Sequence, residues 1–509
     1  MQYGFVLDQS RCIGCHACTV ACKSENDVPV GDFRTWVKYT EEGSFPTVKR
    51  SFAVLRCNQC TNAPCVTICP VNALEKGENG IVDVDPKACI GCKSCMQGCP
   101  YDALYLNEET GTAQKCHFCA HRVEQGLAPA CAVVCPTEAI IPGDFDDSES
   151  VVARMRREFD LSVRKAEAGT GPNVFYRDVA DAGIDPGLTS SAGGHLWADR
   201  HPGLDATTQE YEAMEAKART VYDVAHTPYW GWRVTAYLLT KTLAAGMFLS
   251  PWLAAVTAGE WGSVPTIASA GLALFFLLVT TLLLIFDLKR PERFFYILTR
   301  PNFDSWLVRG TFFLMGFGGL ITAQLGVALF DVELGSGAQT ALNVATAIAA
   351  ALSACYTGWL FGQAKGRVLW MRKGLWAHLI VQAFVGGGAL ALLLGVLGVD
   401  LPGETTIRTV LVVSLITHLV LVLTEGQMSP KGREAEYART IGLIKKGPFA
   451  KKHWGLGVFA GILVPTLLCL AGGASGTGAL LAAAGLLALV GLLFEKDILV
   501  RAGQALSIS

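Results

Sequence analysis

Cysteines are the residues of this sequence with the most evident chemistry. The chain has 18 cysteines in 509 residues, and all but Cys355 and Cys469 lie before residue 136. These sixteen form four groups, each of which begins with C-x2-C and ends with C-x3-C. The groups are Cys12, Cys15, Cys18 and Cys22; Cys57, Cys60, Cys65 and Cys69; Cys89, Cys92, Cys95 and Cys99; and Cys116, Cys119, Cys131 and Cys135. Thiolates at such spacings bind zinc or the iron of iron–sulfur clusters.

The spacing favours [4Fe–4S] clusters over zinc and over disulfides. The first and third groups match the bacterial C-x2-C-x2-C-x3-C run, in which three cysteines hold one cluster and the fourth ligates another. The second and fourth groups repeat this motif with middle loops of four and eleven residues. Four-ligand zinc sites do not require that repeat, and the N-terminus lacks the basic and apolar segments that would export a disulfide-rich protein. We therefore expect two reciprocal pairs of groups, four clusters, and single-electron transfer.

Residues 1–143 resemble the four-cluster ferredoxin subunit of membrane-bound molybdopterin oxidoreductases, such as the dimethyl-sulfoxide and polysulfide reductases. The matching stretches are CNQCTNAPCVTICPVNAL, ACIGCKSCMQGCPYDA and KCHFCAHRVEQGLAPACAVVCPTEAI. The resemblance implies an α+β ferredoxin-like double domain in which the first group pairs with the fourth and the second with the third. The ligand sets it implies are Cys12, Cys15, Cys18 and Cys135; Cys22, Cys116, Cys119 and Cys131; Cys57, Cys60, Cys65 and Cys99; and Cys69, Cys89, Cys92 and Cys95.

Residues 144–230 form a predicted linker with amphipathic helices. Residues 148–169 have the pattern of a charged amphipathic helix, with Ser148 or Ser150 as its N-cap. Residues 207–224 favour a helix by composition, and the intervening stretch, 181–205, is rich in Gly, Pro and Ser and predicts a loop. A connection of this length is unusual for a simple tether, so we expect it to lie over the ferredoxin or against a partner. A solvated connector is the alternative.

The rest of the chain, residues 231–509, predicts an all-α bundle of eight transmembrane helices. Eight apolar segments each approach the length needed to cross a bilayer, and only short loops separate them, unlike the core of a large soluble enzyme. They lie at about 233–256, 265–287, 309–330, 338–361, 374–397, 406–424, 454–472 and 478–495. Pro251 and Pro465 lie within the first and seventh segments, where kinks are expected.

Basic residues predict how the bundle is oriented. The loops on the side of the N-terminus contain eighteen Lys and Arg residues, whereas the opposite side has only Arg408. Such a bias marks the cytoplasmic side of a membrane protein. We therefore expect a multi-pass protein of the inner (plasma) membrane, with residues 1–143 and both termini in the cytoplasm. The absence of an export signal agrees with this orientation.

Ionisable side chains in the predicted spans are candidates for function because they are costly in lipid. They are Lys241, Asp287, Tyr356, His378, His418 and Glu425, all in the half of the bundle nearer the N-terminal side. A quinone headgroup needs hydrogen-bond partners for its oxygens and a source of protons, which a His or Lys near an acid can supply. Two alternatives remain open. The two acids could pair with loop arginines at the membrane interface, and the two histidines could be axial ligands of haem b.

Residues 230–505 resemble the polysulfide-reductase, NrfD/PsrC-type, quinone-reactive membrane subunit. The resemblance rests on FDLKRPERFFYILTRPNFDSW at 286–306, YTGWLFGQAKGRVLW at 356–370 and LVRAGQ at 499–504. It implies eight helices, no haem and a quinone site beneath the nearest iron–sulfur cluster.

These patterns together predict the electron-transfer and membrane-anchor subunit of a quinone-linked respiratory oxidoreductase. Its cofactors would be four [4Fe–4S] clusters and either menaquinone or ubiquinone. Its partner would be a large catalytic subunit that carries molybdopterin, as in sulfite or formate dehydrogenase-like complexes. A respiratory complex without molybdenum and a passive membrane anchor are the alternatives. The net charge of −2 gives no sign of nucleic-acid binding, and no substrate-specific active site is expected in this chain.

Overall fold

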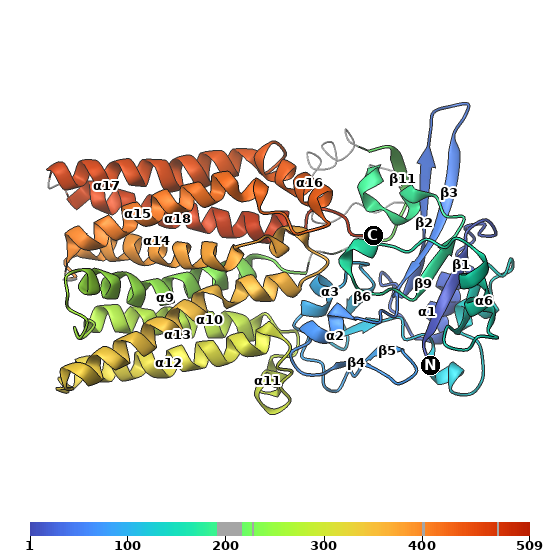
Figure 1. Ribbon diagram of the computed structural model, residues 1–509, viewed down its shortest axis with the longest axis horizontal. Helices are drawn as coiled ribbons and strands as arrows, with labels where there is room; N and C mark the ends of the chain where they lie inside the picture. The colour runs from blue at the N-terminus through green and yellow to red at the C-terminus, as the bar shows by residue number, and fades with distance from the viewer. Residues whose placement is uncertain (191–215, 226, 228, 400–402, 476–477) are drawn as a thin grey trace.

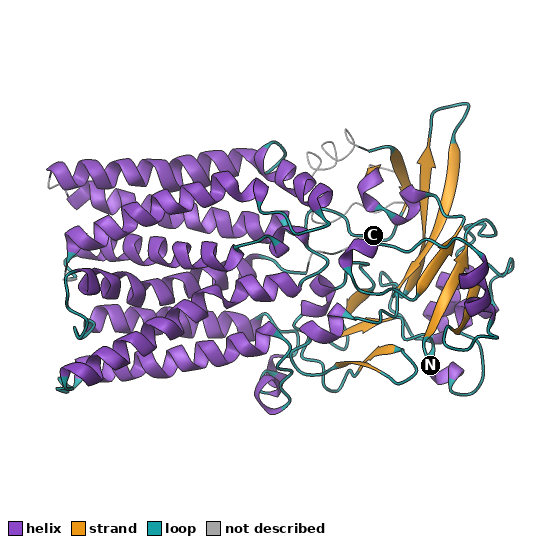
Figure 2. Cartoon of the chain, in the orientation of Figure 1, coloured by secondary structure: helices purple, strands orange, loops and turns teal. Residues whose placement is uncertain are grey.

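The chain divides into a half that contains strands and a half made of long helices, which meet end to end (Figure 1). We call them the cysteine-rich half, residues 1–225, and the membrane half, residues 229–509. The computed structural model describes residues 1–190, 216–225, 227, 229–399, 403–475 and 478–509. Figure 2 shows the strands gathered in the cysteine-rich half and the long helices aligned in the membrane half.

The four cysteine groups build two lobes, each from two short helices that pack on one another. In the outer lobe, α1 (Ala17–Glu25) packs on α5 (Ala130–Val133), and in the inner lobe, α2 (Pro64–Ile68) packs on α3 (Ser94–Gly98). Each helix contains the third cysteine of its group, and the fourth cysteine follows one turn later. The fourth cysteine lies inside α1 but beyond the ends of α2, α3 and α5. The C-x3-C spacing therefore keeps the two thiols about one turn apart, so that they can reach two different clusters.

Small sheets hold the two lobes. A three-stranded sheet, β8-β1-β9, and a four-stranded sheet, β10-β11-β2-β3, lie at the outer lobe, and the pairs β4-β5 and β6-β7 flank the inner lobe. The strands are β1 (Tyr3–Asp8), β2 (Thr35–Glu42), β3 (Lys49–Arg56), β4 (Leu74–Lys76), β5 (Val82–Val84), β6 (Leu104–Asn107), β7 (Thr112–Lys115), β8 (Ile140–Asp144), β9 (Val174–Arg177), β10 (Thr189–Ser190) and β11 (Ala218–Tyr222). Three more short helices are α4 (Ala120–Val123), α6 (Val151–Glu158) and α7 (Asp181–Ile184).

The segment 144–230 lies over the cysteine-rich half and contributes to its sheets. Strand β9 pairs in parallel with β1, and β11 pairs with β2. Helix α6 is shorter than predicted but begins at Ser150, whose hydroxyl accepts a hydrogen bond from the Ala153 N–H at 3.2 Å, as an N-cap does. The helix predicted over 207–224 is wrong where it can be compared, because Ala218–Tyr222 is a strand that pairs with β2. Residues 207–215 lie outside the described residues.

The membrane half contains eight helices long and apolar enough to cross a bilayer, within the described part of the chain. Their ends lie within three residues of the predicted ones, except at the end of the last helix. The helices are α9 (Trp232–Thr257), α10 (Ile267–Phe286), α12 (Trp306–Leu329), α13 (Ser336–Gln363), α14 (Leu375–Val396), α15 (Glu404–Thr424), η6 (Lys452–Leu463) continued by α17 (Val464–Ser475), and α18 (Gly478–Ala502). Helix α18 continues to Ala502 rather than ending at 495, because Lys496 is buried inside the bundle and the Glu495 side chain is only 9% exposed.

The seventh span changes its helical form at Pro465. Residues Lys452–Leu463 form a π-helix, and an ordinary α-helix follows from Val464. Proline has no N–H to close an α-helical hydrogen bond with the preceding turn, so the wider helix ends where the proline begins. Departures of this kind are frequent at functional sites, and this one places His453 in the bundle interior. Between the spans lie α11 (Tyr296–Thr299), η4 (Val368–Met371) and α16 (Glu434–Lys445).

Candidate functional site

The loops of all four cysteine groups have a left-handed residue at the same position. The residue before the second cysteine of each group has a positive φ: 70° at Gly14, 43° at Gln59, 68° at Gly91 and 60° at Phe118. Glycine adopts this conformation without steric cost, whereas for other L-residues it costs roughly 1–2 kcal/mol. Gln59 and Phe118 therefore carry strain of the kind that is retained at functional sites, and the four groups are copies of one structural unit.

The sixteen thiols gather in four places, each of which combines three cysteines of one group with the fourth of another. One cavity is lined by Cys22, Cys116, Cys119 and Cys131, and another by Cys69, Cys89, Cys92 and Cys95. Burial raises the pKa of the Cys12 thiol with help from neighbouring Cys135 and Cys15, and that of Cys65 with help from Cys99, Cys57 and Cys60. All the cysteines are free thiols, and four thiols in one place are the donor set of a [4Fe–4S] cluster.

Two fully buried cations lie among these thiols, and sequence reasoning did not find them. Arg56 donates a hydrogen bond from Nη1 to the Cys131 sulfur at 3.3 Å. Lys115 donates from Nζ to the Cys116 carbonyl at 2.7 Å. Burial opposes the charge on Lys115, but the sulfurs of Cys57 and other cysteines outweigh that effect and raise its pKa. Both positive charges therefore offset negative charge on the thiolates.

The inner lobe is docked onto the membrane half by residues 287–305, which we call the docking loop. Arg293 donates from Nη1 to the Cys89 carbonyl at 2.9 Å, and Asn302 donates from Nδ2 to the Cys69 carbonyl at 2.8 Å. The backbone of Gly91 lies so close to Lys289 that a Cβ on the glycine would be 2.7 Å from the lysine Cβ. The thiol set that contains Cys69 and Cys89 therefore faces the membrane half.

Asp287, one of the predicted site residues, lies at this junction. It ends α10, and its carboxylate pairs with Lys93 at 3.0 Å, just after Cys92. Burial raises the pKa of the Asp287 carboxyl, and the ammonium of Lys93 partly offsets that rise. The structure thus places Asp287 in an interface ion pair, which was the alternative to a quinone role, although its partner is a lysine of the cysteine-rich half rather than a loop arginine.

Lys241 and Tyr356 come together directly below this ion pair. Lys241 is 1% exposed, donates to the Thr357 hydroxyl and lies 4.4 Å from the centre of the Tyr356 ring. Tyr237, also buried, lies one turn before Lys241 on α9. Helix α9 packs against α10, which Asp287 ends, and against α13, which contains Tyr356. A buried lysine amine and two phenols thus form a polar site beneath the inner lobe.

His378, His418 and Glu425 lie in a second polar region, between α14, α15, α18 and η6. His418 Nε2 is 2.7 Å from the Glu495 carboxylate, and His378 Nδ1 is 2.8 Å from Arg372. Glu425 pairs with Arg372 at 2.6 Å. Sequence reasoning missed Arg372, Gln382, His453, Glu495 and Lys496. The pair Glu-Lys inside the apolar stretch LLFEKDILV is a usable signal, although two adjacent charges also predict the end of a span.

The two histidines do not fit the haem alternative in this arrangement. Their ring centroids are 4.9 Å apart, and the edge of one ring faces the other. Axial ligands lie on opposite faces of a porphyrin, and rings in direct contact leave no room for one between them.

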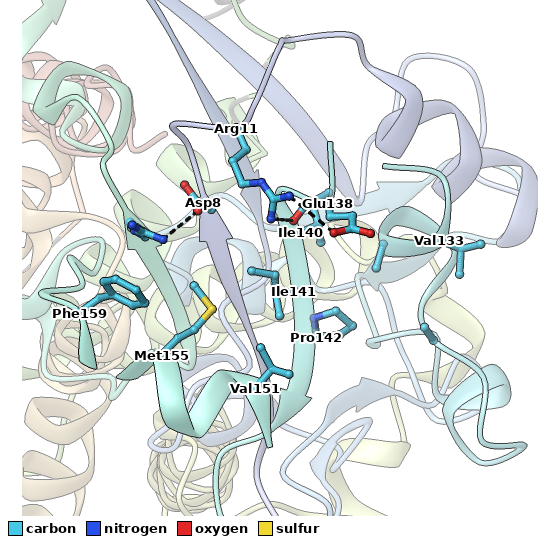
Figure 3. A pocket seen from close by; sticks show the side chains of 13 residues that line it. Asp8, Arg11, Val133, Glu138, Ile140, Ile141, Pro142, Val151, Met155 and Phe159 are labelled. Atoms are coloured by element: carbon cyan, nitrogen blue, oxygen red, sulfur yellow. Dashed lines mark hydrogen bonds and ion pairs between the residues drawn. The ribbon is translucent and has the colours of Figure 1, made fainter. Parts of the chain in front are cut away.

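The outer lobe is open to solvent at the far end of the molecule. Cys15 is exposed, and Cys12 and Cys135 are half-buried. A cavity on this lobe has a volume of about 530 Å³. Figure 3 shows Ile141, Val151, Met155 and Phe159 among the side chains that line it. Arg11 and Glu138 pair at 3.5 Å beside it. The end of the cysteine-rich half opposite the membrane half is therefore a partly apolar, accessible surface.

Fold and site together define an iron–sulfur protein joined to a multi-pass membrane domain. The chain belongs to the polysulphide reductase, NrfD, family, whose model matches residues 221–507, and a 4Fe-4S dicluster domain matches residues 48–145.

The cysteine-rich half is 46% identical over 203 residues to a tetrathionate reductase subunit of Salmonella typhimurium, covering 39% of this chain and 80% of the relative. It is 40% identical over 204 residues to a putative dimethyl sulfoxide reductase iron-sulfur subunit of Halobacterium salinarum, covering 34% and 78%. It is 45% identical over 179 residues to the thiosulfate reductase electron transfer subunit PhsB of Salmonella typhi, covering 35% and 92%. These matches confirm the predicted fusion of an iron–sulfur subunit with an NrfD-type membrane subunit.

Proposed function

We propose that this chain passes electrons between a separate catalytic subunit and membrane quinone. The observation that carries the proposal is the docking of one thiol set directly above the polar site of Lys241 and Tyr356. A passive anchor would not need a buried lysine at that position, because a charged side chain in the bilayer interior costs several kcal/mol.

Four [4Fe–4S] clusters would be held by four thiol sets. These are Cys12, Cys15, Cys18 and Cys135; Cys22, Cys116, Cys119 and Cys131; Cys57, Cys60, Cys65 and Cys99; and Cys69, Cys89, Cys92 and Cys95. Single-electron transfer is the chemistry that such clusters supply when bound. The protein holds the thiols, excludes water from the inner lobe and offsets their negative charge with Arg56 and Lys115.

In the membrane half, Lys241 and Tyr356 would contact the headgroup of menaquinone or ubiquinone. Their ammonium and hydroxyl groups can donate hydrogen bonds to a quinone oxygen. His378, His418 and Glu425 would handle its protons, and Asp287 would hold the inner lobe in place above the site. The six residues thus divide between binding, proton handling and docking.

The catalytic partner would bind at the exposed outer lobe, opposite the membrane. The relatives are named as subunits of tetrathionate, dimethyl sulfoxide and thiosulfate reductases, which supports a molybdopterin-containing partner. Sulfite and formate dehydrogenase-like complexes are further candidates. A complex without molybdenum, fed by a haem or flavin protein, is the second candidate. Gentle purification of the tagged chain with metal analysis and mass spectrometry would separate them, because molybdenum or tungsten should accompany the large subunit only in the first case.

We infer that the cysteine-rich half lies in the cytoplasm, on the side of the inner membrane that carries the excess of basic residues. At least seven of those eighteen residues have structural roles as well. Arg367, Arg372, Arg433 and Lys496 are buried, and Lys289, Arg290 and Arg293 bind the cysteine-rich half. An epitope inserted at Phe45, which is 91% exposed at the tip of the β2–β3 hairpin, should be accessible to antibody in inverted vesicles and protected in spheroplasts. The reverse result would overturn this orientation.

Reduction of quinone by the full chain tests the proposed function. The purified chain should contain about sixteen iron atoms, and short-chain quinones should oxidise it after chemical reduction. Lys241→Ala should slow that oxidation at least ~10-fold. Thr240→Val is a matched control, because the Thr240 hydroxyl lies beside Thr280 of α10 instead. Equal rates in both variants would exclude Lys241 from the site, and a wild-type chain that no quinone oxidises would leave only the passive anchor.

A further inference from the structure

The second polar region of the membrane half forms one connected network. Gln382 donates from Nε2 to the Glu495 carboxylate at 2.9 Å, and its carbonyl oxygen accepts from Lys496 Nζ. The same Glu495 oxygen is 2.7 Å from His418 Nε2. Lys496 is fully buried on α18, and this helix packs against α9, which contains Lys241. The network therefore begins beside the proposed quinone site.

The other end of the network reaches the side of the membrane that faces the cysteine-rich half. Glu425 contacts Arg372 at 2.6 Å and the Lys445 ammonium at 3.8 Å. The Lys445 side chain is 19% exposed. A continuous line of ionisable groups thus joins the bundle interior to that surface.

Arg372 fixes the position of the proton on His378. A guanidinium group can only donate, so the Nδ1 atom of His378, 2.8 Å from Arg372, must accept. The ring therefore carries its proton on Nε2. That atom has no hydrogen-bond partner among the described residues, and neither has Nε2 of His453. Nδ1 of His418 is a third such atom. These buried imidazole nitrogens are left for ligands that can exchange hydrogen bonds.

A cavity between these groups has the size of water rather than of quinone. Its volume is about 30 Å³, and its polar lining residues are Arg372, His378, Gln382, Glu425, His453 and Glu495. One water molecule needs roughly 10–15 Å³ and two to four polar partners, whereas pockets for drug-sized ligands span about 300–1,000 Å³. The cavity is therefore suited to one or two bridging waters.

The charges around the cavity do not favour a metal ion. Ligand atoms of His378, His418 and Glu495 lie within 4.8 Å of one another, as they would in a metal site. However, Arg372 donates to His378, and Lys496 donates to Gln382 beside Glu495. Two positively charged groups in contact with these three residues would repel a metal cation bound between them. They suit instead a site that gains and loses protons.

We propose that this cavity is a hydrated proton-exchange site, in which the His418–Glu495 couple moves protons between the Lys241–Tyr356 site and water on the side of the cysteine-rich half. The inference rests on the proposed function. In quinone reduction, the reduced iron–sulfur half supplies two electrons and the couple relays two protons, which form the two O–H bonds of quinol. Quinol oxidation reverses each transfer. The charged or titratable groups around the couple are Arg372, His378, Glu425, His453 and Lys496.

The experiment compares Glu495→Gln with Asp497→Asn in the full chain with its clusters. Asp497 lies two residues along α18, but its carboxylate binds Arg501 at 2.7 Å, outside the network. Each protein is reduced with dithionite and mixed with menadione or decylubiquinone, and reoxidation is followed by absorbance between pH 6 and 9. Glu495→Gln should slow reoxidation at least ~10-fold above pH 7, with recovery as the pH falls or when a small weak acid is added. Asp497→Asn should match the wild type.

Further variants keep loss of structure and failure of the proposed function apart from the inference. Glu495→Asp, which retains a carboxylate, should restore the wild-type shape of the pH profile even if Glu495→Gln lowers cluster absorbance. A Glu495→Gln profile identical to that of Asp497→Asn would overturn the proton assignment, as would a Glu495→Asp profile without recovery. One tightly bound zinc per chain, lost in Glu495→Gln, would replace the proton site with a metal site. A wild-type chain that quinone does not reoxidise would instead remove the proposed function itself.

Discussion

The outer and inner lobes contain the same cysteine motif in different surroundings. Gly14 and Gly91 occupy equivalent positions with φ of 70° and 68°. In the outer lobe, Gly14 packs against the Phe52 ring, whereas in the inner lobe Gly91 packs against Lys289 of the membrane half. Cys15 of the outer lobe is exposed, while most inner-lobe cysteines are buried. The motif thus determines the cofactor, and the surroundings determine what each lobe connects to.

Replacing the two equivalent glycines is the strongest test of this comparison. In Gly91→Ala the new Cβ would be 2.5 Å from the Gly111 carbonyl and 2.7 Å from the Lys289 Cβ, so the docking loop must shift. We expect quinone-dependent reoxidation to fall at least ~10-fold and hydrogen exchange in residues 287–305 to rise. Gly14→Ala is the matched control, because its Cβ would be 2.6 Å from Phe52 but far from the membrane half.

The two variants should both lose some iron, because both loops are strained by an added Cβ. Only Gly91→Ala should expose the docking loop to exchange. Equal exchange in the two variants would mean that the inner lobe is not held by this contact.

The same contrast explains what the sequence could predict. Each group of four cysteines lies within about 25 residues of sequence. Its spacing alone therefore predicts the cysteine ligands and the loops between them. The docking loop was also visible, as the family-like stretch 286–306, although its partners were not. The eight spans could be placed because apolar length alone defines them.

The polar network of the membrane half could not be found in this way, because its partners are far apart in sequence. Gln382 and Lys496 are separated by 114 residues, and His418 lies 77 residues before Glu495. Neither a motif nor a helical period links such residues; only helix packing brings them together. A charge count cannot distinguish the buried Lys496 from a basic residue of a loop. For this reason the last span is predicted to end at 495, which is too short.

Lys165 offers a pH-dependent test of how the two halves are joined. It is buried 3.9 Å from Glu436 of α16, and burial lowers its pKa to about 8 from the usual 10.5, with Glu436 opposing the shift. A lowered pKa means that the folded chain binds fewer protons than the unfolded chain between these values, so stability rises with pH there. At 1.36 kcal/mol per unit the gain is at most about 3 kcal/mol.

The measurement is the difference in unfolding free energy between wild type and Lys165→Met from pH 8 to 10.5. Cysteines and tyrosines titrate in both proteins, so the difference isolates Lys165. It should grow in favour of the wild type as the pH rises. A constant difference would show that Lys165 is not buried uncharged at this junction.

The two buried cations should tune different thiol sets. Arg56 lies beside Cys131, Cys116 and Cys18, whereas Lys115 lies beside Cys57 and Cys65 and shares Cys116 as a third, weaker neighbour. Arg56→Met and Lys115→Met each remove a positive charge that stabilises the more negative, reduced state. Midpoint potentials should fall on the order of 100 mV. Redox titration by electron paramagnetic resonance should assign the larger shift to outer-lobe signals in the first variant and to inner-lobe signals in the second.

The smallest effect is expected at an ion pair that also joins the inner lobe to the docking loop. Glu108 and Lys289 approach to 2.5 Å, yet their side chains are 71% and 41% exposed. Lys93 and Asp287, at 3.0 Å, are only 7% and 16% exposed. Water and salt screen an exposed pair, which contributes about 0–1 kcal/mol, whereas loss of one partner from a buried pair costs about 3–5 kcal/mol.

Glu108→Gln should therefore leave the melting temperature and quinone-dependent reoxidation almost unchanged, and 0.5 M salt should mimic it in the wild type. Lys93→Met should lower both measurably in any salt. A Glu108→Gln effect as large as that of Lys93→Met would mean that distance, rather than burial, decides how strongly the inner lobe is held to the membrane half.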